Sequence, residues 1–101
     1  MNEQSSTIRK ARVTLYTRPG CHLCDEAKLA MLAARCDDEY TLDEVNIEND
    51  PRLLHSYRYD VPVVLINGIE AFRHRVATED FRRLVMAKPT WSEIHERNEA
   101  P

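Results

Sequence analysis

The stretch LYTRPGCHLCDEAK, Leu15–Lys28, joins an apolar, strand-like run to an acidic helical start through two cysteines. Pro19 and Gly20 are turn residues and end the apolar run. Cys21 and Cys24 follow three positions apart, where the turn leads into the helical pattern. The pair has three possible explanations: a redox dithiol, half of a zinc site, or a coincidence of composition.

Length and charge limit the class of protein. The chain has 101 residues, which fits one domain. Its 14 basic and 17 acidic residues give a formal net charge of −3, which offers no electrostatic footprint for nucleic acid. No apolar run approaches the roughly 18 residues of a membrane-spanning helix, and the first ten residues lack the apolar core of a secretory signal. We therefore expect a cytoplasmic monomer with no nucleic-acid or membrane partner.

The cysteine count favours chemistry over structural cross-linking. Three cysteines without a signal peptide indicate reduced thiols in a cytosol-like compartment, and an odd count excludes a fully paired disulfide framework. We expect Cys36 to be a core thiol rather than a third redox partner.

Strand and helix patterns alternate along the chain. Residues 1–10 predict a flexible tail, residues 11–88 the folded domain, and residues 89–101 a polar tail. The order predicted is β-α-β-α-β-β-α, an α/β fold with a four-stranded mixed sheet, helices on both faces and a parallel βαβ unit in the first half. Strands are expected at Arg12–Thr17, Tyr40–Glu48, Val63–Ile66 and Ile69–Arg73, and helices at Cys24–Arg35, Pro51–Tyr57 and Glu79–Met86.

Local signals mark the ends of several of these elements. Asp50 before Pro51 is typical of an N-cap followed by a first helical residue. Asn67–Gly68 is a strong hairpin signal. Thr78 is expected to cap the last helix. That helix is expected to face Phe81, Leu84 and Val85 inward.

These features resemble the thioredoxin fold, and the short form without an extra N-terminal strand and helix is similar to glutaredoxin. The resemblance covers about residues 12–87. It rests on a strand ending in LYTRPGCHLC, a helix that begins inside the CxxC, and Val61–Pro62 before a strand–NG–strand hairpin. It is greatest to the small bacterial glutaredoxin-like domains, and it implies a thiol–disulfide oxidoreductase acting on protein or small-molecule disulfides.

Thiol–disulfide exchange needs a thiolate, a second thiol that resolves the mixed disulfide, and access for a partner. Cys21 is expected at a helix N-terminus, where unpaired backbone N–H groups and the helix dipole stabilise a thiolate. Cys24, one turn further, is expected to be less accessible and to act as the resolving thiol. A charged His22 would favour the thiolate, whereas Asp25 and Glu26 oppose it. The alternative for His22 is an exposed histidine with no electrostatic role.

The resemblance also implies residues that contact the substrate. Val61–Pro62 matches a pair with a cis-proline opposite the CxxC, whose preceding backbone binds the substrate as an added strand. The alternative is a trans proline at the start of a strand. Arg18 matches a basic residue that meets a carboxylate of glutathione, and its alternative is a solvated loop arginine.

Two departures from the glutaredoxin pattern concern glutathione. Asp60 replaces the usual threonine before Val-Pro, and Val76–Ala77 replaces a Gly-Gly pair ahead of the last helix. In glutaredoxins that segment holds the γ-glutamyl end of glutathione, and Thr78 and Asp80 are the candidate binding residues there. We expect no bound cofactor. Either glutathione, as a poor reductant, or a thioredoxin-reductase-like protein is expected to restore the dithiol.

Two other classes remain as alternatives. A structural zinc site uses four ligands, usually in two pairs, and this CxxC has no second pair. A cluster shared between two chains through Cys21 and glutathione is another form of metal binding. The second class is an interaction module with a vestigial dithiol. We assign no metal ligand.

Overall fold

The computed structural model describes residues 10–87, so most of the two predicted tails lies outside the described residues. Within this range no helix has the length and apolar character needed to cross a membrane. Two short 3₁₀ turns, η1 (Asp37–Glu39) and η2 (Ile47–Asn49), flank β2. The main elements are β1 (Ala11–Thr17), α2 (His22–Ala33), β2 (Tyr40–Asn46), α3 (Pro51–Tyr57), β3 (Val63–Ile66), β4 (Ile69–Arg73) and α4 (Thr78–Ala87).

The four strands form one mixed sheet in the order β2-β1-β3-β4. β1 and β2 run parallel, which requires a crossover connection, and α2 provides it. β3 lies antiparallel to β1 and to β4, and the last two are joined by the predicted Asn67–Gly68 turn. Both turn residues have positive φ, at 53° and 84°, as a tight hairpin turn requires. The predicted element order and mixed sheet are therefore confirmed.

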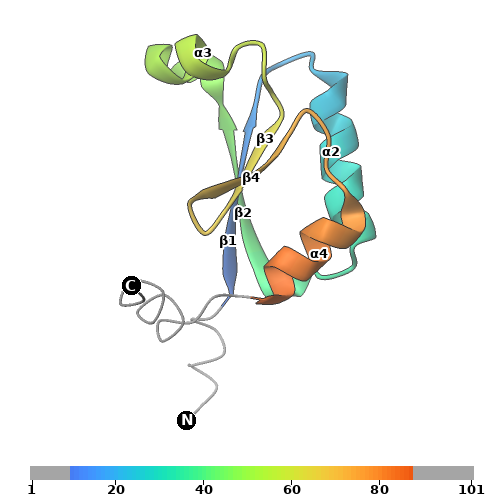
Figure 1. Cartoon of the computed structure of the whole chain (residues 1–101). Helices are drawn as coiled ribbons and strands as arrows, with labels where there is room; N and C mark the ends of the chain where they lie inside the picture. The colour runs from blue at the N-terminus through green and yellow to red at the C-terminus, as the bar shows by residue number, and fades with distance from the viewer. Residues whose placement is uncertain (1–9, 88–101) are drawn as a thin grey trace, which may run out of the picture.

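The larger core lies between the sheet and the pair of helices α2 and α4. Both helices cover the same side of the sheet, and α3 lies on the other side, near the ends of β1 and β2 (Figure 1). In β1, alternate residues Val13 and Leu15 are buried on the α2 and α4 side. Phe81 of α4 meets Tyr40 edge-on, with ring centroids 5.3 Å apart. This packing fixes α2 and therefore fixes the position of the CxxC at its start.

A second, smaller hydrophobic cluster surrounds the two cysteines of the CxxC. Its buried members are Cys24, Ile47 and Val61. Leu53, Leu54 and Tyr57 of α3 pack against them, and the ring centroids of Tyr57 and Tyr16 lie 5.0 Å apart. Asp50 caps α3 as predicted, since its side chain accepts the N–H of Arg52 at 2.9 Å. The cluster thus joins residues 16–24, which include the two cysteines, to residues 47–61.

Two predictions about α4 are wrong. Thr78 is the first residue of α4 rather than its cap, and its hydroxyl donates to the carbonyl of Ala30 at 2.9 Å. It therefore ties α4 to α2. Leu84 is 39% exposed, because Phe81 and Val85, four residues apart, define the buried line and Leu84 lies beside it.

The predicted ends of two other elements are corrected. β2 ends at Asn46 rather than at Glu48, because the Asn46 side chain accepts the N–H of Glu48 at 2.9 Å and turns the chain into η2. α2 begins at His22 and ends at Ala33. Arg35 has a φ of 57°, outside the helical region, so the helix does not extend to it.

Candidate active site

The two cysteines of the CxxC are joined as a disulfide at the start of α2, with their Cα atoms 5.3 Å apart. Cys21 is the N-cap of α2 and is half-buried, whereas Cys24 is 1% exposed. Gly20 has a φ of 77°, a left-handed conformation that glycine adopts without strain, and the exposed Pro19–Gly20 turn leads into Cys21. The sulfur of Cys21 therefore lies nearer the surface and that of Cys24 lies beneath it.

The backbone of α2 points hydrogen-bond donors at Cys21. The N–H of Cys24 donates to Sγ of Cys21 at 3.1 Å, and the N–H of Asp25 donates to the Cys21 carbonyl at 3.3 Å. A helix N-terminus carries the positive end of the helix dipole, which favours negative charge there. This arrangement can stabilise a thiolate on Cys21 once the disulfide is reduced.

The charged neighbours of the CxxC are paired among themselves. Asp25 lies 4.0 Å from the ammonium of Lys28, and Glu26 lies 3.8 Å from the guanidinium of Arg75. These cations reduce the opposing field that the two carboxylates exert on the Cys21 sulfur. His22 is the first residue of α2 and is exposed, which fits the alternative of an exposed histidine with no electrostatic role. An effect of its charge on the Cys21 thiolate stays a prediction.

The peptide bond between Val61 and Pro62 is cis, so the trans alternative is wrong. Val61 is 9% exposed and packs in the cluster that contains both cysteines. The carbonyl of Pro62 accepts the N–H of His74 at 2.7 Å, which ties this loop to the end of β4. The structure thus brings Val61 together with Cys21 and Cys24, and strand-like pairing of its backbone with a substrate stays a prediction.

Asp60, which replaces the usual threonine before Val-Pro, forms ion pairs with residues at the end of β4. Its carboxylate lies 2.9 Å from the guanidinium of Arg73 and 3.6 Å from Nε2 of His74. Arg73 also hydrogen-bonds Glu70, which lowers the pKa of the Glu70 carboxyl and raises the pKa of Arg73. Much of the negative charge of Asp60 is therefore offset within the protein, and the loop before Val61 is held by ion pairs.

Arg18 is partly exposed and makes specific contacts within the protein, and its contact with a glutathione carboxylate stays a prediction. Its Nη2 lies 3.1 Å from a carboxylate oxygen of Glu48, and its Nη1 donates to the carbonyl of Arg58 at 3.1 Å. The side chain thus links the turn before Cys21 to η2 and to the segment that follows α3. Sequence reasoning missed Glu48 as a partner of Arg18. The two residues lie thirty positions apart, and their opposite charges were the one sign in the sequence that they pair.

A pocket of about 300 Å³ opens beside Cys21 between the start of α2 and the end of β2. Lys28 reaches across it, with Nζ 3.3 Å from a carboxylate oxygen of Glu44. Sequence reasoning did not assign Lys28, Glu44 or Asn46 to the site. The charged and polar residues that line the pocket are Thr17, Arg18, Cys21, Asp25, Lys28, Glu44 and Asn46.

Thr78 and Asp80, the candidates on α4, lie outside the packed cluster around the cysteines. Thr78 bonds Ala30, which is about 9 Å beyond Cys24 along the axis of α2 at the usual rise per residue. The Asp80 carboxylate lies 2.7 Å from Arg83 on the same helix. Binding of a substrate by these two residues stays a prediction.

Cys36 is a buried free thiol, as predicted for a core residue. It is 3% exposed, and burial raises the pKa of its thiol. Burial also raises the pKa of its neighbour Tyr40. Among residues 10–87, no group of three or more His, Cys, Asp or Glu side chains is placed to hold a metal ion.

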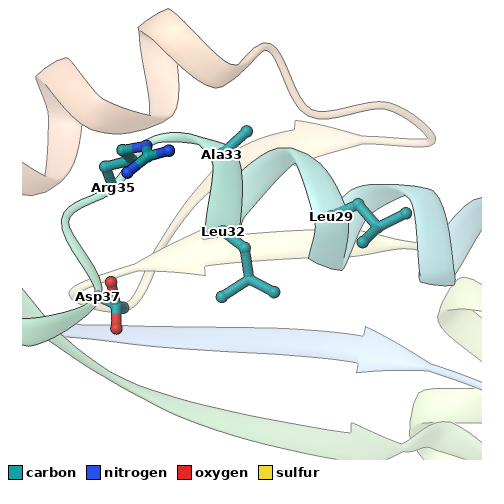
Figure 2. A pocket seen from close by; sticks show the side chains of 5 residues that line it. All are labelled: Leu29, Leu32, Ala33, Arg35 and Asp37. Carbon is teal, nitrogen blue, oxygen red and sulfur yellow. The ribbon is translucent and has the colours of Figure 1, made fainter.

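A second hollow, of about 520 Å³, lies at the other end of α2 from the CxxC. Leu29 and Leu32 point outward from α2 into it, and Arg35 and Asp37 border it from the connection to β2 (Figure 2). These leucines are 65% and 58% exposed. None of the predicted site residues lines this hollow.

Solved structures of other proteins have the same fold. A structural genomics target protein from X. campestris superposes with a TM-score of 0.64 at 31% identity, over 76% of this chain and 99% of that one. A mutant thioredoxin from Halobacterium salinarum superposes with a TM-score of 0.55 at 11% identity, over 83% of this chain and 80% of that one. The fold is therefore the α/β thioredoxin-like fold that the resemblance implied.

Sequence comparison gives the family. A protein from Dictyostelium discoideum described as "Glutaredoxin-like protein YDR286C homolog" is 31% identical over 77 residues, which cover 70% of this chain and 71% of that protein. The family model "Glutaredoxin-like domain (DUF836)" matches residues 12–86. With its two cysteines placed as a disulfide at the start of α2, this chain belongs to the glutaredoxin-like domain (DUF836) family.

Proposed function

We propose that this protein is a glutaredoxin-like thiol–disulfide oxidoreductase that uses the dithiol of Cys21 and Cys24. The observation that carries the proposal is the asymmetry of the pair. Cys21 caps α2 and accepts a backbone N–H on its sulfur, while Cys24 is buried one turn further on. A nucleophile needs stabilised negative charge and access to the substrate, whereas a resolving thiol needs to lie close to the mixed disulfide and can be buried.

The reaction has two exchange steps. The Cys21 thiolate attacks one sulfur of a substrate disulfide, forms a mixed disulfide, and expels the other sulfur as a thiolate. Cys24 loses its proton and attacks Cys21 Sγ, which forms the Cys21–Cys24 disulfide and releases the second substrate thiolate. Two electrons pass from the protein dithiol to the substrate, and the released thiolates take up protons according to their pKa values.

The substrate is a disulfide in a protein or a small molecule. The loop with Val61 and Pro62 packs against the two cysteines, which supports a role for the Val61 backbone in pairing with an extended segment of the substrate. A segment bound there would lie alongside the sulfur of Cys21. In this proposal His22, which is exposed next to Cys21, also contacts the substrate, from the first turn of α2.

The oxidised protein needs a reductant, either glutathione or a thioredoxin-reductase-like protein. The Val76–Ala77 segment before α4 supports glutathione as the poorer of the two, because it lacks the glycines of the glutaredoxin pattern. Thr78 and Asp80 are the residues on α4 proposed to meet a reductant. The reaction requires a compartment in which the dithiol is returned to its reduced state, such as the cytoplasm.

The test is the reduction of a disulfide-linked fluorescent peptide by prereduced protein. Wild-type protein is expected to release one equivalent of peptide thiol and to end as the Cys21–Cys24 disulfide. Cys21→Ser is expected to lose the reaction, and Cys36→Ala is the matched control because Cys36 is buried in the core away from the site. A Cys21→Ser protein with the wild-type rate would contradict the role of Cys21 as the nucleophile, and an inert wild type would favour the interaction-module alternative.

A further inference from the structure

We infer that Glu48 is a specificity-determining residue of the Cys21 site, which disfavours anionic groups beside the target disulfide relative to neutral ones. The inference rests on the proposed thiol–disulfide exchange and concerns which substrates that exchange prefers. The residue that would attract an anion, Arg18, lines the same pocket as Cys21. Arg18 already forms an ion pair with Glu48.

The guanidinium of Arg18 is committed on two sides. Both Nε and Nη2 hydrogen-bond one carboxylate oxygen of Glu48, at 3.3 and 3.1 Å. Nη1 donates to the carbonyl of Arg58 at 3.1 Å. The carbonyl contact fixes the side chain in place, so Arg18 cannot turn toward a substrate carboxylate without losing a bond. An anionic substrate therefore meets a guanidinium whose charge Glu48 already offsets.

The opposite side of the pocket is also neutralised from within. Nζ of Lys28 lies 3.3 Å from Glu44 and 4.0 Å from Asp25, so two carboxylates face one ammonium. A substrate carboxylate that enters the pocket meets two cations that are already paired and one negative charge in excess, since Arg18 and Lys28 face the three carboxylates of Glu48, Asp25 and Glu44. A neutral group of the same shape breaks no ion pair and meets no repulsion.

Glutathione makes the consequence specific, because it carries two carboxylates and its diethyl ester carries none. The same fluorescent peptide is linked through its cysteine either to glutathione or to the diethyl ester. Prereduced protein is mixed with each substrate in a single turnover at low ionic strength, where charge effects are screened least. The measured quantity is the ratio of the second-order rate constant for the ester to that for the acid.

We expect the wild-type protein to prefer the ester, and Glu48→Gln to lower the ester-to-acid ratio by up to about fivefold, the upper limit that exposed ion pairs support. Glutamine keeps the shape of the side chain and removes its charge. The matched control is Asp43→Asn. It makes the same change in net charge on β2, at an exposed position adjacent to Glu44, whose side chain points to the opposite face of the sheet. This control is expected to keep the wild-type ratio.

The outcomes separate the two proposals. If the wild type reduces both substrates and Glu48→Gln shows the wild-type ratio, or changes it no more than Asp43→Asn does, the assignment of Glu48 is overturned while the oxidoreductase function stands. If the wild type reduces neither substrate, the proposed function itself fails. A fall in the ratio for Glu48→Gln alone supports the inference.

Discussion

The backbone N–H of Cys24 donates a hydrogen bond to Sγ of Cys21 at 3.1 Å. This N–H belongs to the first turn of α2, and it is shared with the carbonyl of Cys21, also 3.1 Å away. The cysteine sulfur takes the place that an oxygen of serine or aspartate has in a common N-cap. The nucleophile proposed for the reaction is thus held by the same contact that begins the helix.

A lowered pKa of the Cys21 thiol is the first prediction. The N–H of Cys24 and the helix dipole favour the thiolate, so the pKa is expected to lie below the value of about 8.5 for a free cysteine. It is measured from the pH dependence of iodoacetamide labelling in a Cys24→Ser, Cys36→Ala variant, where Cys21 is the one cysteine left. Labelling that follows a pKa at or above the free value would contradict the proposed role of the N-cap contact.

Cys36 is expected to make stability fall at high pH. Burial raises the pKa of its thiol, so the folded state holds this proton more tightly than the unfolded state. The stability that Cys36 contributes is fully present below the unfolded pKa of about 8.5 and is lost as the pH rises through the folded pKa. Urea unfolding of the oxidised protein between pH 7 and pH 10 measures this loss.

The matched variant for that measurement is Cys36→Ala, in which the decline between about pH 8.5 and pH 10 is expected to be smaller. Tyr40, whose pKa is also raised by burial, remains in both proteins and titrates later. Identical pH profiles for the two proteins would show that Cys36 does not carry the effect. The folded wild type is also expected to leave Cys36 unlabelled by iodoacetamide.

Phe81 is expected to be a principal contributor to stability. It is fully buried and meets Tyr40 edge-on, so Phe81→Ala should lower the free energy of unfolding by about 3–5 kcal/mol. Leu84→Ala is the matched comparison on the same helix. Leu84 is 39% exposed, so its replacement should cost clearly less. Urea unfolding measures both, and equal losses would contradict the packing described for α4.

The elements with strong local signals could be predicted from the sequence. Asp50 and Pro51 mark the start of α3 at its observed residue, and Asn67–Gly68 forms the turn between β3 and β4. Caps and tight turns depend on a few neighbouring residues, so their chemistry is legible without the rest of the chain. The cis peptide bond before Pro62 could be predicted only from the resemblance to glutaredoxin, because no local pattern in the sequence indicates it.

Contacts between distant segments could not be predicted in the same way. Thr78 has the residue type of an N-cap, and it was predicted as one, but its hydroxyl bonds Ala30 because α4 packs on α2. Arg18 and Glu48 are thirty positions apart, and they meet because the parallel strands β1 and β2 end side by side at Thr17 and Asn46. Tertiary packing decides the partners of such side chains, and local preference does not.

The most direct measurement is the capture of a mixed disulfide by a Cys24→Ser variant incubated with a disulfide-linked peptide, followed by mass spectrometry of its proteolytic fragments. Without the resolving thiol, the peptide is expected to remain bound through Cys21 in about one equivalent per chain, and dithiothreitol should release it. Peptide attached through Cys36, or no attached peptide under conditions that label Cys21 with iodoacetamide, would contradict the proposed nucleophile.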